Sequence, residues 1–232
     1  MSSPDTIEIK APSNDKKMLV AMAGIGVICA LLIVLTFEGT FSIIEKNKAE
    51  ALEKAIFKVI PDITNTKAFE LKQDQSFAML VPGSIGTSLI YAGYDDQDQL
   101  KGIAVKANGQ GYGEVLNILY GYDPDAQKII GFYVLESKET PGLGDKIEKD
   151  PIFLANFEAL DVALDEDLNS LKNEITTVKR GVKTKDWEID GITGATISSR
   201  AIGDILSVST KQWLPLIYKH KDTFVMKDKT EK

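Results

Sequence analysis

The stretches LIYAGYDDQDQLKGIAV at 89–105 and VLNILYGYDPDAQKIIGFYVL at 115–135 follow one pattern. In each, β-branched and aromatic residues lie on both sides of an aspartate-containing turn, which is typical of a β-hairpin. The segments expected to pair are 89–94 with 100–105 and 115–122 with 129–135. Two consecutive hairpins predict an antiparallel sheet. We expect Tyr94 and Tyr122 to pack against cross-strand neighbours in its core.

Helical patterns lie on both sides of this predicted sheet. Apolar residues at helical spacing in 41–61 predict an amphipathic connecting helix that packs on the domain. A second helix is expected over 151–160, with Ile152, Phe153 and Phe157 facing inward. The fold class expected is therefore α+β, with antiparallel hairpins and flanking helices.

The last third of the chain carries one more strand and one more helix. Residues 175–182 read as a strand, and the charges of Arg180 and Lys183 near its end are expected to face water. From about residue 198 an apolar helical pattern begins, which we expect to bend or end near Pro215. The sequence thus predicts one domain at 62–222, followed by a polar tail at 223–232.

An uncharged, mostly apolar run extends from Met18 to Phe37. Its length, roughly 20 residues, is what a helix needs to cross a bilayer. A cleaved signal peptide is less favoured, because its apolar region is usually roughly 7 to 15 residues long. Lysines at positions 10, 16 and 17 precede the run. The positive-inside rule then predicts a cytoplasmic tail at 1–17, a transmembrane helix at 18–37 and an extracytoplasmic domain.

Composition excludes several classes of function. The net charge of -7 disfavours nucleic acid as a partner, since no basic stripe is present. The chain has one cysteine, Cys29, so it cannot form an intrachain disulfide or ligate an iron–sulfur cluster with cysteines alone. It also has one histidine, His220, which rules out a multi-histidine metal site. We expect neither a metal site nor a catalytic acid–base residue.

The segment DGITGATISS at 190–199 places a threonine directly before a helical pattern. Thr196 should therefore lie at or just before a helix N-terminus, where free backbone N–H groups suit a phosphate. A second segment, ETPGLGDK at 139–146, combines a proline with two glycines. It predicts a compact loop whose amides can approach a flat ring closely, with Leu143 as an apolar face.

Both segments resemble motifs of two related families, the G subunit of the Rnf electron-transport complex and the C subunit of the sodium-translocating NADH:quinone reductase. In these families a flavin transferase moves FMN from FAD onto the threonine that follows Gly-Ala, forming a phosphoester. The resemblance implies covalent FMN on Thr196 and a transferase that reads Asp190 and Gly191. The cofactor contacts that it implies are Tyr112, Glu139, Thr140, Gly142, Leu143, Gly144, Lys146, Thr193, Gly194, Ala195 and Ser198.

The resemblance favours the Rnf family and implies its setting. Such a chain has one N-terminal transmembrane helix followed by a single FMN-binding domain on the periplasmic side of the bacterial inner membrane. It relays electrons within a ferredoxin:NAD oxidoreductase that translocates Na⁺ or H⁺, without substrate chemistry of its own. Its partners are the other membrane and iron–sulfur subunits and the flavin transferase. The family often has a histidine shortly before the glutamate, where this chain has Ser137-Lys138.

Three other interpretations stay open at this point. The chain could be the C subunit of the quinone reductase, which has other partners and the same local chemistry. It could be an anchored FMN-domain protein that serves another extracytoplasmic reductase or a sensor, and the missing histidine is compatible with this. It could also be a structural membrane protein in which Thr196 only caps a helix.

Overall fold

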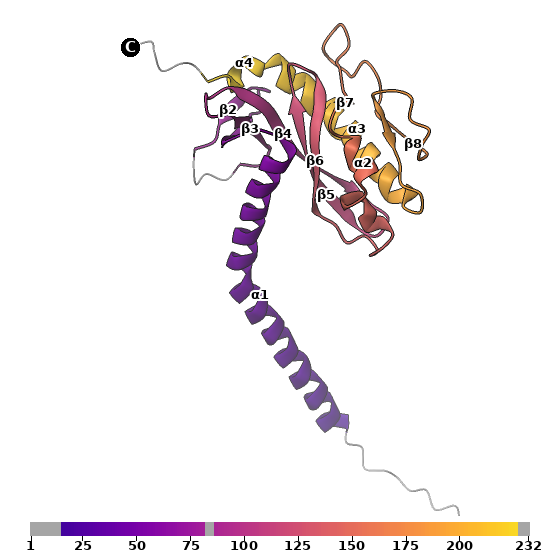
Figure 1. The fold of residues 1–232 in the computed structure, drawn as a ribbon. Helices are drawn as coiled ribbons and strands as arrows, with labels where there is room; N and C mark the ends of the chain where they lie inside the picture. Colours follow the sequence, from indigo (N-terminus) through magenta and orange to yellow (C-terminus); the bar gives the residue numbers. More distant parts are fainter. Residues whose placement is uncertain (1–14, 82–85, 227–232) are drawn as a thin grey trace, which may run out of the picture. The chain divides into compact units, whose positions relative to one another are not determined.

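The computed structural model describes residues 15–81 and 86–226 of the chain. It divides the chain into two compact units, residues 1–50 and 51–232 (Figure 1). Of the predicted tails, residues 1–14 and 227–232 lie outside the described ranges.

The N-terminal helix α1 is continuous over Asp15–Val59, so it contains both the predicted membrane span at 18–37 and most of the predicted connecting helix at 41–61. No proline interrupts this stretch. The hydroxyls of Thr36 and Thr40 donate hydrogen bonds to carbonyls one turn earlier, at 2.7 and 2.8 Å. Its large apolar side chains between Met18 and Phe37 are exposed within the chain. By length and composition α1 can cross a membrane.

The last turns of α1, from Ala51 on, belong to the second unit and pack on its sheet. Ile56 and Val59 are buried there in a small apolar cluster with Leu119. Two glycines on neighbouring strands, Gly121 and Gly131, face each other in register and make room for the helix end. A Cβ atom added at either would lie 2.0 or 2.3 Å from the carbonyl oxygen of Val59.

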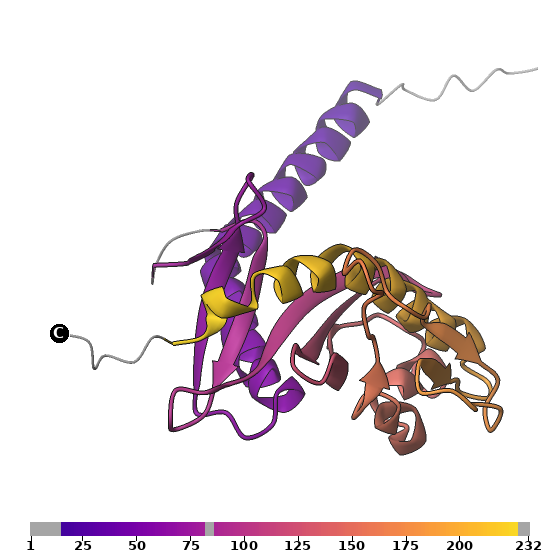
Figure 2. The same ribbon diagram turned by 90° about the horizontal axis from the view of Figure 1, so that it is seen from above.

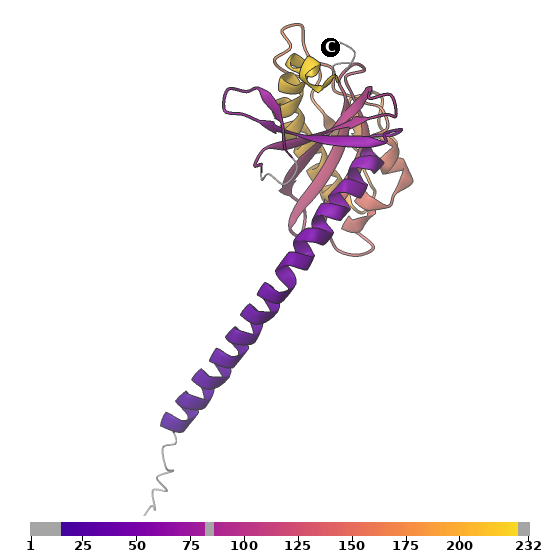
Figure 3. The ribbon, with the colours of Figure 1, turned by 90° about the vertical axis from the view of Figure 1, so that its left-hand side faces the viewer.

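One antiparallel sheet forms the body of the second unit (Figures 1 and 3). Its strand order is β2-β1-β3-β4-β5-β6-β7. The strands are β1 (Asn65–Leu71), β2 (Phe77–Met79), β3 (Leu89–Tyr94), β4 (Leu100–Gln110), β5 (Val115–Asp123), β6 (Lys128–Glu136) and β7 (Leu160–Asp161). The pairs β3/β4 and β5/β6 are the two predicted hairpins, and both are confirmed.

The two faces of the sheet bury different residues because side chains alternate along a strand. On β4, Ile103 and Val105 belong to the main core, whereas Ala104 belongs to the cluster under the end of α1. Tyr94 and Tyr122 are fully buried in the main core, as predicted. Burial raises the pKa of Tyr94 to about 12.

The long helix α3 (Thr196–Lys219) covers the main-core face of the sheet (Figure 2). It does not end near Pro215 but continues to Lys219. After it, α4 (Lys221–Phe224) carries Phe224 into the core, where its backbone carbonyl accepts a hydrogen bond from the Tyr94 hydroxyl at 2.8 Å. The packed domain thus extends beyond residue 222, into the expected polar tail.

The helix predicted over 151–160 is much shorter than expected. It is α2 (Pro151–Ala155), and Leu160 is already part of β7. Phe153 and Phe157 are buried as predicted, but Ile152 is 53% exposed, so its inward placement was wrong. The strand predicted over 175–182 is β8 (Thr176–Val178), which pairs in parallel with β9 (Glu188–Asp190).

Candidate functional site

Thr196 is the first residue of α3 and follows a tight turn. Gly194 adopts a φ of +83°, a left-handed conformation that favours glycine. The turn is closed by a hydrogen bond from the Ala195 amide to the Ile192 carbonyl at 3.1 Å. Among the described residues, no side chain caps this end of the helix. The sequence prediction that Thr196 stands at a helix N-terminus is therefore confirmed.

The hydroxyls near Thr196 differ in their availability. Ser198 is buried and donates to Glu139 Oε2 at 2.6 Å. Ser199 is buried, donates to the Ala195 carbonyl at 2.8 Å and accepts from the Ile192 amide at 3.0 Å. Thr196 is exposed, and within the described part of the chain its hydroxyl has no hydrogen-bond partner. Among these three it is the hydroxyl free to react.

The ETPGLG loop leads from β6 into a short 3₁₀ helix, η1 (Gly144–Glu148). Gly142 has a φ of +78°, and its amide donates to Asp145 Oδ1 at 2.7 Å. The Lys149 ammonium group hydrogen-bonded to Asp145 lowers the pKa of that carboxyl, and the Gly142 amide adds to the effect. Hydrogen bonds within the loop and η1 therefore stabilise its conformation.

Glu139, at the start of this loop, holds three segments together. Its carboxylate is buried, and Oε1 accepts from the amides of Tyr112 at 2.8 Å and Gly113 at 3.2 Å. Oε2 accepts from the Ser198 hydroxyl. The loop between β4 and β5, the ETPGLG loop and the first turn of α3 therefore meet at one carboxylate.

Two glycines leave the space that this carboxylate occupies. A Cβ added at Gly111 would lie 2.5 Å from Oε1, and one added at Gly144 would lie 2.2 Å from Oε2. Both distances are far shorter than a van der Waals contact. Gly111 and Gly144 therefore have a structural role, since a larger residue at either position would displace the Glu139 carboxylate.

A cavity of about 360 Å³, here called the motif pocket, lies between these segments. It brings together nine of the residues singled out from the sequence: Tyr112, Glu139, Thr140, Leu143, Gly144, Gly194, Ala195, Thr196 and Ser198. Ile197 also lines it and was not predicted. Gly142 and Lys146 do not line it. Three apolar side chains at its edge, Tyr112, Leu143 and Ile197, are more than half exposed.

A second cavity, of about 330 Å³, also includes Thr196. We call it the basic pocket, because Lys179, Arg180 and Arg200 line it. Gly191 and Thr193, which were expected near the cofactor or the transferase, lie here instead of in the motif pocket. Local sequence patterns do not indicate this pocket, since its cations come from two segments that are distant in sequence.

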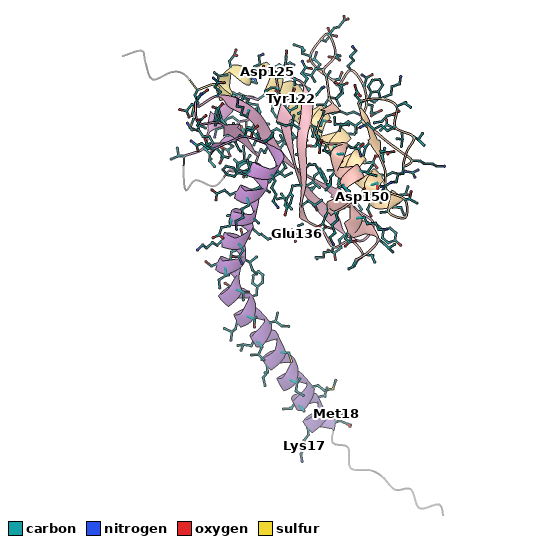
Figure 4. All side chains as sticks on the ribbon, viewed as in Figure 1. Lys17, Met18, Tyr122, Asp125, Glu136 and Asp150 are labelled. Atoms are coloured by element: carbon teal, nitrogen blue, oxygen red, sulfur yellow. The ribbon has the colours of Figure 1, made fainter. Side chains whose placement is uncertain are left out.

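Arg180 does not simply face water, as was expected. Its guanidinium pairs with Asp150 at 2.7 Å and lowers the pKa of that carboxyl. Asp150, labelled in Figure 4, also caps α2 by accepting from the amides of Ile152 and Phe153, both at 3.0 Å. Lys183 donates to Asn156 Oδ1 at 3.1 Å.

Asp190 and Gly191 take part in the local structure beside Thr196. Asp190 Oδ1 accepts from the Gly181 amide at 2.7 Å, and the Asp190 amide donates to Asn156 Oδ1 at 2.9 Å. The Gly191 amide donates to the Val178 carbonyl at 3.0 Å. These bonds fix the end of β9, from which the turn to Thr196 begins.

The site fits a phosphate ester of a flat aromatic ring. A free hydroxyl, an uncapped helix N-terminus and a pocket with exposed apolar edges meet at Thr196. Within residues 15–81 and 86–226 there is no group of three or more His, Cys, Asp or Glu side chains that could hold a metal ion.

Comparison with known proteins agrees with this geometry. Residues 111–209 match the model of the FMN-binding domain family. This range lies within the second unit and includes the ETPGLG loop, Thr196 and both pockets.

The chain is similar to subunits of ion-translocating complexes. The chain is 30% identical over 193 residues to the G subunit of the ion-translocating oxidoreductase complex of Methanosarcina acetivorans, covering 82% of this chain and 89% of that protein. It is 28% identical to the G subunit of the Na⁺-translocating ferredoxin:NAD⁺ oxidoreductase complex of Acetobacterium woodii, covering 80% and 84%. The C subunit of the Na⁺-translocating NADH-quinone reductase of Parabacteroides distasonis has a similar solved structure, with 21% identity, a TM-score of 0.49, and coverage of 66% and 78%. The chain belongs to the family of G subunits of ion-translocating oxidoreductase complexes, the Rnf family.

Proposed function

We propose that this chain carries FMN as a phosphoester on Thr196 and relays electrons within an Rnf-type ferredoxin:NAD oxidoreductase coupled to translocation of Na⁺ or H⁺. Family membership supports the complex, and the FMN-binding domain supports the cofactor. The flavin supplies the redox chemistry, while the protein supplies its position and surroundings.

The observation that carries the proposal is the position of Thr196. Its free hydroxyl stands at the rim of a pocket whose other residues come from the ETPGLG loop and from the loop that holds Tyr112. Ser198 and Ser199 are buried and already hydrogen-bonded, so neither competes as an acceptor. A covalent link at Thr196 leaves the ring free to reach the motif pocket.

The ring is proposed to lie against Leu143, Ile197 and Tyr112, with the Thr140 hydroxyl able to hydrogen-bond to its polar edge. These apolar side chains are exposed on the protein surface, and covering them with an aromatic ring removes apolar area from water. Glu139, Gly142, Gly144 and Lys146 are proposed to act mainly through the shape of the loop.

The apolar helix α1 and the family membership both support a membrane setting. We propose that residues 18–37 span the bacterial inner membrane, with the N-terminus in the cytoplasm and the FMN domain on the periplasmic side. The other membrane and iron–sulfur subunits of the complex are the proposed electron partners. A flavin transferase is the proposed maturation partner, with Asp190 and Gly191 in its recognition segment.

The test is to express the chain with and without a flavin transferase and to purify it in detergent. We expect fluorescence on the denatured band only with the transferase, and peptide mass spectrometry should find FMN minus water on the peptide that contains Thr196. Affinity purification from native membranes should recover Rnf subunits. Recovery of quinone-reductase subunits instead, or of a different reductase, would overturn the assignment to the Rnf complex while leaving the flavin intact.

A further inference from the structure

Thr196 separates two pockets of opposite charge. On one side, the motif pocket contains a single charged side chain among the described residues, the buried carboxylate of Glu139. On the other side, the described lining of the basic pocket includes Lys179, Arg180 and Arg200 and no acidic side chain. An anion attached to Thr196 therefore experiences repulsion from one direction and attraction from the other.

We propose that the basic pocket is a phosphate subsite, so that the phosphate of FMN faces Lys179 and Arg200 while the ring lies in the motif pocket. This rests on the proposed attachment at Thr196 and adds the direction in which the cofactor lies. Phosphate oxygens accept hydrogen bonds from lysine and arginine, and such charge-assisted bonds are stronger than neutral ones. The uncapped amides of the first turn of α3 favour an anion at the same place.

The two cations are available for this role. Within residues 15–81 and 86–226, Lys179 and Arg200 form no ion pair, and both are exposed. Arg180 is different, because it is already paired with Asp150. Binding a phosphate to Lys179 and Arg200 therefore breaks no salt bridge of the described structure. In a chain with a net charge of -7, such a pair of unmatched cations beside one hydroxyl favours a local anionic ligand over a surface role.

The experiment compares FMN with riboflavin, which has the same ring and no phosphate. The full-length Thr196→Val chain, purified in detergent, cannot form the ester, so binding of either flavin is reversible. Dissociation constants are measured by fluorescence titration for this chain and for the same chain carrying Lys179→Gln, Arg200→Gln or Lys172→Gln. Lys172 is an exposed lysine that lines neither pocket and serves as the matched control.

We expect FMN to bind more tightly than riboflavin. Lys179→Gln and Arg200→Gln should each raise the dissociation constant of FMN about tenfold, as expected for the loss of one hydrogen bond to a charged group. Neither substitution should change the dissociation constant of riboflavin. The preference for FMN should also fall as salt is added. Equal affinities for FMN and riboflavin would overturn the proposal. So would an equal loss of affinity for both flavins in Lys179→Gln and Arg200→Gln, or a loss of FMN affinity in Lys172→Gln as large as in those two variants.

A second measurement uses the covalently modified protein with Thr196 intact. The ³¹P resonance of the ester should shift in Arg200→Gln and Lys179→Gln and stay in place in Lys172→Gln. An unchanged resonance contradicts the subsite even when the flavin is attached. If no flavin is attached to Thr196, the titration of the Thr196→Val chain still tests the phosphate subsite. Failure of the attachment and failure of the subsite are therefore separate results. A chain that neither carries nor binds flavin overturns both.

Discussion

The Ser198 hydroxyl donates to the Glu139 carboxylate at 2.6 Å, joining residues 59 positions apart in the sequence. Through this bond the first turn of α3, which presents Thr196, is tied to the loop that forms the opposite wall of the motif pocket. The carboxylate and its donors therefore hold these segments of the pocket together.

Glu139→Ala should loosen the motif pocket, because it leaves the Ser198 hydroxyl and two backbone amides without their acceptor. We expect a loss of about 1 to 3 kcal/mol in the free energy of unfolding. Hydrogen exchange should speed up at Tyr112, Gly113 and the ETPGLG loop. Glu139→Gln keeps an acceptor oxygen and should retain most of the protection. Equal exchange in the Ala variant and the unchanged chain would remove this role from Glu139.

Asp150 should make the stability depend on pH through its pair with Arg180. The pKa of this carboxyl is lowered from 3.8, chiefly by the Arg180 hydrogen bond. A lowered folded-state pKa means that the stabilisation is complete above the unfolded value and is lost as the pH falls through the folded one. Asp150→Ala should therefore cost about 0.5 to 2 kcal/mol at neutral pH, mostly as a lost helix cap. The difference from the unchanged chain should shrink as the pH falls below 3.8 and vanish once the pH is below the lowered folded-state pKa.

Thermal unfolding across the pH range measures this, with Glu166→Gln as a control at an exposed carboxylate that has no ion pair within the described residues. A stability difference that persists unchanged into strong acid would show that Asp150 does not act through its ionised form.

Truncation should separate the membrane part of α1 from the part that belongs to the domain. A chain that begins at Ser42 keeps Ile56 and Val59, so we expect it to be monomeric and folded without detergent. A chain that begins at Ile60 loses the turns that cover Leu119 and should aggregate, since each exposed large apolar side chain costs about 1.5 to 3 kcal/mol. Size-exclusion chromatography distinguishes them. Similar behaviour of the two chains would contradict the packing of α1 on the sheet.

Asp190 offers a test of how the transferase recognises its target. Asp190→Asn keeps an acceptor for the Gly181 amide, whereas Asp190→Ala removes it. If the transferase recognises the negative charge, both variants should be modified less than the unchanged chain. Asp190→Asn should nevertheless have the same melting temperature as the unchanged chain. Full modification of Asp190→Asn, with loss only in Asp190→Ala, would mean that Asp190 works by holding β9 in place.

Local patterns predicted the two hairpins of the sheet, β3/β4 and β5/β6, but not β1, β2 or β7. Each hairpin joins segments that are close in sequence, so alternation and turn residues determine their pairing. The helix predicted over 151–160 was too long, for a local reason that the spacing of apolar residues does not reveal. The Asn156 side chain donates to the Phe153 carbonyl at 2.9 Å, satisfying the helix end, and α2 stops at Ala155.

The site was predicted in part. Motif resemblance brought Thr140, Leu143 and Thr196 together, and the structure places all three on one pocket. Neither Ile197 nor the basic pocket could be found in this way. Lys179 and Arg200 become neighbours only because β8 pairs with β9, which ends just before the turn to α3. That parallel pairing links segments that are not adjacent in the chain and has no local signal.

Thr196 is the residue proposed to carry FMN. Thr196→Val, expressed with the flavin transferase, removes the hydroxyl and no hydrogen bond of the described structure, so the fold should persist. We expect the denatured band to lose its flavin fluorescence and the mass of FMN minus water to disappear. Thr193→Val, Ser198→Ala and Ser199→Ala should keep both signals. Flavin that remains on the Thr196→Val protein, or that mass spectrometry maps to another residue, would contradict attachment at Thr196.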